Sequence, residues 1–106
     1  MVIFIMKFDI LPDKQQVYAE WLSNFALHAQ LAVPGIIDLQ GFRPIGGAAQ
    51  VLGIYHFATL EDFSRWFHHE EIQRVLRESR TMLNNIQYEL WEGSPFSPEP
   101  LKATWK

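Results

Sequence analysis

Two polar side chains one helical turn apart, Asn24 and His28, are the first candidates for chemistry in this 106-residue sequence. In a helix they lie at the edge of an apolar stripe that carries Trp21. There the amide could hold a phenol or carbonyl oxygen of a ligand, and the imidazole could accept a proton. The alternative is that His28 only completes hydrogen bonds where a helix meets a sheet.

A second pair of candidates, Tyr55 and His56, lies within one expected strand. Side chains alternate along a strand, so one of the two must point at the helices that cover the sheet. His56 is therefore a second candidate for a catalytic base, and Tyr55 is a candidate pocket residue. Either ring could instead serve packing alone.

The adjacent histidines His68 and His69 do not predict a metal site. On a regular helix the two rings diverge, and His68 with Glu71 offers only two ligands, whereas catalytic zinc usually takes about three from the protein. His69 is expected to cap a restarted helix or to line the mouth of a pocket. The sequence has no cysteine, which removes thiolate nucleophiles, disulfides and iron–sulfur clusters. We therefore expect no metal site.

Several large aromatic side chains are candidates for the wall of a pocket. Those proposed beside Tyr55 are Trp21, Phe63, Trp66 and Tyr88. Trp66 lies off the apolar helix face that carries Phe63, so it either lines a pocket or extends the core.

Four short runs rich in β-branched and aromatic residues predict strands. They are 2–8, 36–43, 50–57 and 86–91. Between the first two, a helix is expected from an N-cap at Asp13 to a stop at Pro34-Gly35. Its apolar residues form one stripe when they are counted at about 100° per residue. The stripe consists of Val17, Tyr18, Trp21, Leu22, Phe25, Ala29 and Ala32.

A second helical region is predicted between the third and fourth strands. It begins after Thr59, a typical N-cap, and extends to about Leu83, before a stop at Asn84-Asn85. Its apolar positions change face near 68–71, which indicates a break and a restart rather than one straight helix.

This order, β-α-β-β-α-β, predicts an α+β ferredoxin-like fold with a four-stranded antiparallel sheet. Residues 1–91 form the expected domain. Residues 92–106 form a proline-rich tail, which cannot continue a sheet interior.

Charge and hydropathy exclude several classes of partner. Nine basic against twelve acidic side chains give a net charge of −3, so no nucleic-acid or anionic-membrane surface is expected. The apolar run 1–6 lacks the features of a signal peptide and is far shorter than the roughly 20 residues of a membrane-spanning helix. We expect a cytoplasmic protein.

The first strand is apolar on both faces, and this predicts a homodimer. Helices cover only one face of such a sheet, so the other is expected to meet a second copy of the chain. The tail, which carries Trp105, is expected to pack on the partner subunit. The alternative is a second face that is only partly apolar, because Asp38, Gln40, Gln87 and Glu89 lie on the second and fourth expected strands.

Residues 55–77 carry a local pattern that resembles a known family. A strand ending in an aromatic residue is followed by Thr-Leu-Glu-Asp-Phe-Ser-Arg-Trp (59–66) and then a helix restart. With the element order over 1–91, this is similar to the antibiotic biosynthesis monooxygenase-like proteins of the dimeric α+β barrel superfamily. Many members have a histidine near the position of Ile72. The haem-degrading branch has a first-strand Asn, where this chain offers Lys7, so haem degradation is disfavoured.

The resemblance implies a homodimer with a largely apolar pocket between sheet and helices in each subunit. It also implies a cofactor-independent monooxygenase acting on a small aromatic, polyketide-like compound. In that reaction His28 or His56 would be the base and Asn24 would hold an oxygen. A non-catalytic small-molecule-binding or interaction protein of the same fold is the alternative, and a lactone-type isomerase is a weaker one.

Overall fold

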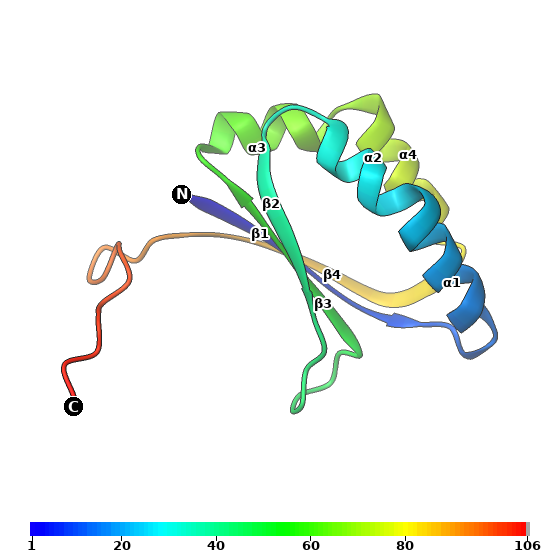
Figure 1. Cartoon of the computed structure of the whole chain (residues 1–106), viewed down its shortest axis with the longest axis horizontal. Coiled ribbons are helices and arrows are strands. Elements are labelled where there is room, and N and C mark those ends of the chain that lie inside the picture. The colour runs from blue at the N-terminus through cyan, green and yellow to red at the C-terminus, as the bar shows by residue number, and fades with distance from the viewer. Residues whose placement is uncertain (106) are drawn as a thin grey trace.

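A computed structural model describes residues 1–105 and shows a four-stranded antiparallel sheet with all helices on one face (Figure 1). The strands are β1 (Val2–Ile10), β2 (Ile36–Phe42), β3 (Val51–Phe57) and β4 (Leu83–Glu92). Their order across the sheet is β2-β3-β1-β4. The predicted element order and the ferredoxin-like α+β fold are therefore confirmed.

The first helical region is less regular than predicted. It consists of a short 3₁₀ turn η1 (Pro12–Lys14), α1 (Gln15–Trp21), a π-helical turn η2 (Leu22–Ala26) and α2 (Leu27–Ala32). The N-cap assignment of Asp13 is wrong, because Asp13 lies inside the 3₁₀ turn that begins at Pro12. Lys14 occupies the N-cap of α1 and makes no side-chain hydrogen bond there.

The π-helical turn changes which residues face the sheet. Up to Leu22 the predicted stripe is confirmed for Tyr18, Trp21 and Leu22, which pack on the core. It is wrong for Val17, which is 51% exposed. From the last residue of η2 onward, the buried positions are Ala26, Gln30 and Val33. Each lies one residue after the predicted Phe25, Ala29 and Ala32 because a π turn accommodates one extra residue. The second half of the predicted stripe is therefore wrong by one residue.

The second helical region is broken where the sequence predicts. It forms α3 (Leu60–Phe67) and α4 (Glu70–Ser79). Thr59 Oγ1 accepts a hydrogen bond from the Asp62 backbone N–H at 3.1 Å, and His69 Nδ1 accepts one from Glu71 at 3.0 Å. Both caps are therefore confirmed, since each satisfies an N–H without an intrahelical partner.

Asn84 and Asn85 do not stop a helix; α4 ends at Ser79, and both lie inside β4. The pairing of β1 with β4 shifts between Lys7 and Asp9, which leaves one extra residue on β4. Asn85 has a φ of 53°, a conformation that Asn tolerates, and its Nδ2 donates to Asp9 at 2.8 Å. The pair therefore forms a β-bulge.

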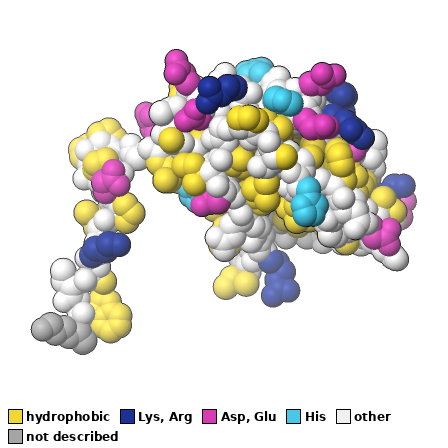
Figure 2. Space-filling view, turned by 45° about the horizontal axis from the view of Figure 1, so that its top comes forward, with side chains coloured by type: hydrophobic (Ala, Val, Ile, Leu, Met, Phe, Trp, Pro, Cys, Tyr) yellow, Lys and Arg dark blue, Asp and Glu magenta, His cyan; other side chains and the backbone are white. Residues whose placement is uncertain are grey.

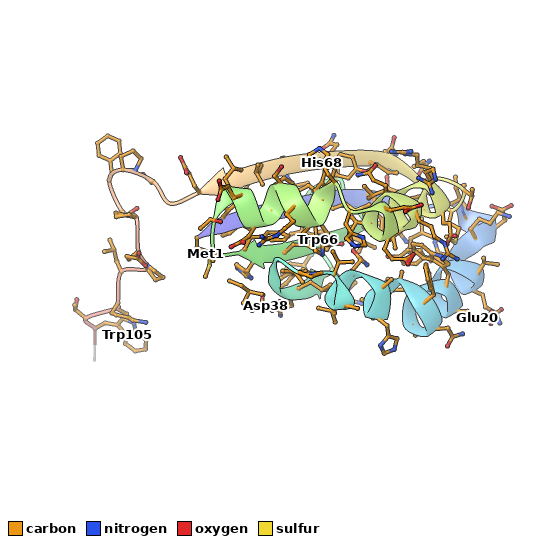
Figure 3. All side chains as sticks on the ribbon, turned by 90° about the horizontal axis from the view of Figure 1, so that it is seen from above. Met1, Glu20, Asp38, Trp66, His68 and Trp105 are labelled. Carbon is orange, nitrogen blue, oxygen red and sulfur yellow. The ribbon has the colours of Figure 1, made fainter. Side chains whose placement is uncertain are left out.

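The core lies between the sheet and the helices. Phe57, Trp66 and Ile72 are at most 1% exposed, and Trp66 lies between α3 and the first helical region (Figure 3). Alternate residues of β1 face this core. They are Val2, Phe4, Met6 and Phe8.

The opposite face of the sheet carries no helix (Figure 1). The cross-strand register places Ile3, Ile5 and Ile54 on it. It also carries an ion pair between Lys7 and Glu89, with Nζ and Oε2 3.1 Å apart. The helix-free face of the sheet is thus largely apolar and also carries paired polar side chains.

The C-terminal segment 93–105 extends away from the body of the molecule (Figures 1 and 3). Phe96, Leu101 and Trp105 are each more than 80% exposed, at 95%, 83% and 84%. Figure 2 shows hydrophobic side chains along this arm. The arm does not pack on the domain of its own chain. Within residues 1–105, no helix is long and apolar enough to cross a membrane.

Candidate functional site

A cavity of about 230 Å³ lies between the sheet and the helical layer. Met6 and Phe8 of β1 form part of its floor, and Leu22 and Leu76 contribute from the helices. Most of the lining is apolar, so the cavity suits an apolar ligand.

Two glycines explain why this part of the interface is not filled. Gly41 of β2 is paired with Gly53 of β3, and both line the cavity. Because they share the face of Tyr55, a side chain at either position would point toward the helices. A Cβ at Gly53 would lie 3.1 Å from Tyr55 Cε1, whereas one at Gly41 would meet no atom within 4 Å. The empty space is therefore adjacent to Gly41, which is exposed at the sheet edge.

A buried hydrogen-bond network holds Tyr55 in the cavity wall. The Tyr55 hydroxyl donates to Gln30 Oε1 at 2.9 Å, and Gln30 Nε2 donates to the Ala26 carbonyl at 2.9 Å. The backbone carbonyl of Gln30 accepts from Trp66 Nε1, also at 2.9 Å. Burial raises the pKa of Tyr55, with smaller contributions from Tyr18 and Tyr88. The Tyr55 hydroxyl therefore stays protonated, and its proton is used in the hydrogen bond to Gln30.

Trp21 is fixed at another edge of the cavity. Its Nε1 donates to Glu78 Oε1 at 2.8 Å, and Arg74 Nε donates to Glu78 Oε2 at 3.1 Å. The bonds from Trp21 and Arg74 lower the pKa of the Glu78 carboxyl. The indole is thereby held between α1 and α4.

Tyr18 also lines the cavity, and its side chain is only 9% exposed. Among residues 1–105, no side chain or backbone group forms a hydrogen bond with its hydroxyl. Desolvation raises the pKa of Tyr18 to about 12. Sequence reasoning placed Tyr18 on the buried stripe without assigning it a role.

The structure separates the nine residues proposed from the sequence into four places. Trp21 and Tyr55 line the cavity. Phe63, Trp66 and Tyr88 instead surround the Phe4 ring, at centroid distances of 5.2, 6.5 and 5.7 Å. They fill the other end of the sheet–helix interface and are not among the lining residues of this cavity.

Asn24, His28 and His69 lie together at a second, shallower hollow of about 460 Å³ on the outer surface. All three are exposed. His56 lies on the helix-free face of the sheet, where its Nδ1 is 2.6 Å from Asp38 Oδ1. The three proposed catalytic side chains therefore do not converge on the cavity within one chain.

Three lining residues were not singled out from the sequence, and only the two glycines among them carry a signal. Gly41 and Gly53 lie inside expected strands, where glycine often marks a place without side-chain packing. Gln30 was hidden by the phase shift of η2, because a regular helix would turn it away from the sheet. No group of three or more His, Asp or Glu side chains within 1–105 is arranged to hold a metal ion.

Comparison with known proteins identifies related sequences and folds. The family model described as Antibiotic biosynthesis monooxygenase matches residues 1–78. No curated protein matches the chain.

Several solved structures share the fold at low sequence identity. A putative antibiotic biosynthesis monooxygenase from Deinococcus radiodurans has a TM-score of 0.76 at 10% identity, covering 99% of this chain and 100% of its own. HapK from Hahella chejuensis has a TM-score of 0.75 at 10% identity, covering 98% and 100%. SnoaB, a cofactor-independent oxygenase from Streptomyces nogalater, has a TM-score of 0.65 at 16% identity, covering 92% and 97%. These similarities support the fold.

We predict that Tyr55→Phe destabilises the protein by about 1–3 kcal/mol, because Gln30 Oε1 loses its donor inside the core. Urea denaturation measures the change. Tyr88→Phe is the matched control: Tyr88 is 41% exposed, and its variant should stay within about 0.5 kcal/mol of the parent. Equal stabilities for the two variants would contradict the role of the Tyr55 hydrogen bond.

Proposed function

This chain belongs to the antibiotic biosynthesis monooxygenase family, and we propose that it is a monooxygenase that oxidises a small aromatic compound in the cavity. The observation that carries the proposal is the apolar cavity between sheet and helices, with Trp21 and Tyr55 held in its wall by hydrogen bonds.

The size of the cavity restricts the substrate. At about 230 Å³ it exceeds the roughly 150 Å³ that accommodates benzene and lies below the roughly 300–1,000 Å³ of most ligand pockets. A compound with one or two fused rings fits this space, and larger ring systems would have to protrude. We propose that the substrate is a phenol such as a naphthol, or a ketone with the same two fused rings.

Such a substrate can supply every electron that the reaction needs. In the example of 1-naphthol, the phenol loses its proton, the resulting anion gives electrons to O2, and a C–O bond forms at the para carbon. The O–O bond then breaks, one oxygen stays as the new carbonyl and the other leaves as water. The balance is one naphthol and one O2 to one 1,4-naphthoquinone and one water. The apolar walls would desolvate the anion and orient it toward O2.

Filling the cavity tests this proposal. Gly41→Leu places a side chain where a Cβ meets no atom within 4 Å, so we expect a folded protein that has lost both 1-naphthol binding and naphthol-dependent O2 consumption. Gly46→Leu is the matched control, because a Cβ there also meets no atom within 4 Å and Gly46 does not line the cavity. Unchanged O2 consumption in Gly41→Leu would contradict the cavity as the reaction site.

The proposed roles of His28 and His56 as bases are tested separately from the cavity. His28→Ala combined with His56→Ala leaves the cavity lining intact, so 1-naphthol binding should persist. If either imidazole takes the phenol proton, O2 consumption falls by about a hundredfold or more. Full activity in the double variant would exclude both histidines as bases.

A second candidate is a non-catalytic binding protein of the same fold. It is favoured by the position of His28 and His56 away from the cavity, which leaves the lining without an imidazole. This candidate predicts 1-naphthol binding by the parent protein without O2 consumption, and Gly41→Leu would abolish that binding.

We also propose that the protein is a homodimer joined through the helix-free face of the sheet. Ile3 and Ile54 lie on this face, and Trp91 of β4 is 51% exposed beside them. The arm 93–105 carries three exposed apolar side chains that find no cover on their own chain. A second copy would bury both surfaces.

The arm provides the test of the dimer. Replacing Phe96, Leu101 and Trp105 with Ser should weaken dimerisation at least about tenfold, since burying each side chain contributes roughly 1.5–3 kcal/mol. The control replaces Ser94, Ser97 and Glu99 on the same arm with Ala. Sedimentation velocity from nanomolar to micromolar concentration measures both variants. A parent protein that is monomeric at micromolar concentration would refute the dimer.

A further inference from the structure

The polar side chains that line the cavity differ in whether they have a hydrogen-bond partner within the protein. Four of the lining side chains with polar atoms make intramolecular hydrogen bonds: Trp21, Gln30, Tyr55 and Ser79. The fifth is Tyr18, whose hydroxyl has no partner in residues 1–105. The Tyr18 hydroxyl is therefore the polar group of the lining that is available to a ligand.

The Tyr18 hydroxyl must face open space. No fully buried polar side-chain atom in the described chain lacks a hydrogen-bond partner, so this unpaired oxygen is not enclosed by protein. The ring packs edge-on against Phe8 at 5.8 Å and beside Trp21 at 6.0 Å. Tyr18 is one of the lining residues, so the cavity is open space within the fold that adjoins this side chain.

The hydroxyl makes no intramolecular hydrogen bond that a phenylalanine would lose. Its capacity to donate and to accept a hydrogen bond is therefore free for a ligand in the cavity.

We propose that the Tyr18 hydroxyl donates a hydrogen bond to the acceptor oxygen of the ligand, a carbonyl or phenolate oxygen on a compound with one or two rings. The proposal rests on the cavity's proposed function and adds the residue that orients the ligand. Tyr18 belongs to the helical layer, and Gly41 and Gly53 belong to the facing sheet. The polar end of the ligand would then lie against α1 and its apolar end against the glycines.

Protonation supports the direction of this bond. Because burial raises the pKa of Tyr18 to about 12, its hydroxyl keeps its proton at neutral pH and acts as a donor rather than a base. Tyr55 is less suited to this role, because its proton is already directed at Gln30.

A pair of probes of similar size tests the proposal. Naphthalene has no acceptor oxygen, whereas 1-tetralone presents one carbonyl. Tyr18→Phe should weaken 1-tetralone binding about three- to tenfold and leave naphthalene binding unchanged. Stability in urea should be unchanged or higher, because no intramolecular hydrogen bond is lost. An equal change for both probes, or none for 1-tetralone, would overturn the proposal.

The carbonyl stretch of bound 1-tetralone gives a direct readout. In the parent protein the infrared band should shift to lower frequency than in an apolar solvent, and Tyr18→Phe should abolish the shift. Failure of both probes to bind would refute the cavity as a ligand site and Tyr18 with it. Tyr18-dependent binding without O2 consumption from 1-naphthol would leave the Tyr18 proposal standing and refute the monooxygenase.

Discussion

The extra residue in the π-helical turn η2 decides which side chains of the first helical region face the sheet. By shifting the helix phase one position, it brings Gln30 into the core in place of Ala29. Gln30 then binds Tyr55 of β3 through its side chain and Trp66 of α3 through its carbonyl. That carbonyl needs an outside donor because the residue four positions on is Pro34, which has no N–H. One residue thus joins three elements, and the cavity lies beside this junction.

The two ends of the sheet–helix interface are packed differently because the strands supply aromatic side chains at one end and glycines at the other. At the Phe4 end, rings from β4 and α3 fill the space around one aromatic side chain. Toward the Phe8 end, Gly53 of β3 lies opposite Met6, and Gly41 of β2 lies opposite Gly53, so neither position supplies a side chain. Aromatic residues predicted as pocket walls, such as Trp66, therefore form core. The space left by the glycines defines the cavity.

Much of the fold could be predicted because its signals are local. The strand patterns, the Thr59 cap and the face change at 68–71 each depend on a few neighbouring residues, and the structure confirms them. The π turn could not be predicted, since a regular helix also buries an apolar stripe. That single miss places Asn24 and His28 at the edge of the predicted stripe, whereas in the structure both are exposed at the outer hollow. Likewise, Asn85 has the backbone preference of a helix stop, and only its pairing with β1 makes it a bulge.

The cavity and the proposed dimer surface lie on opposite faces of the sheet, which allows the two to work independently. Gly41, an exposed residue of the cavity lining, lies on the helix-covered face of β2. Ile5 and the Lys7–Glu89 pair lie on the helix-free face. Covering the helix-free face with a second sheet would leave the helix-covered face free. It would also bury Lys7 and Glu89, and such a pair offsets its desolvation only when its geometry is kept. A sheet-to-sheet contact would thus favour arrangements that leave the 3.1 Å pair intact, so the pair would contribute more to the orientation of the two subunits than to the strength of their association.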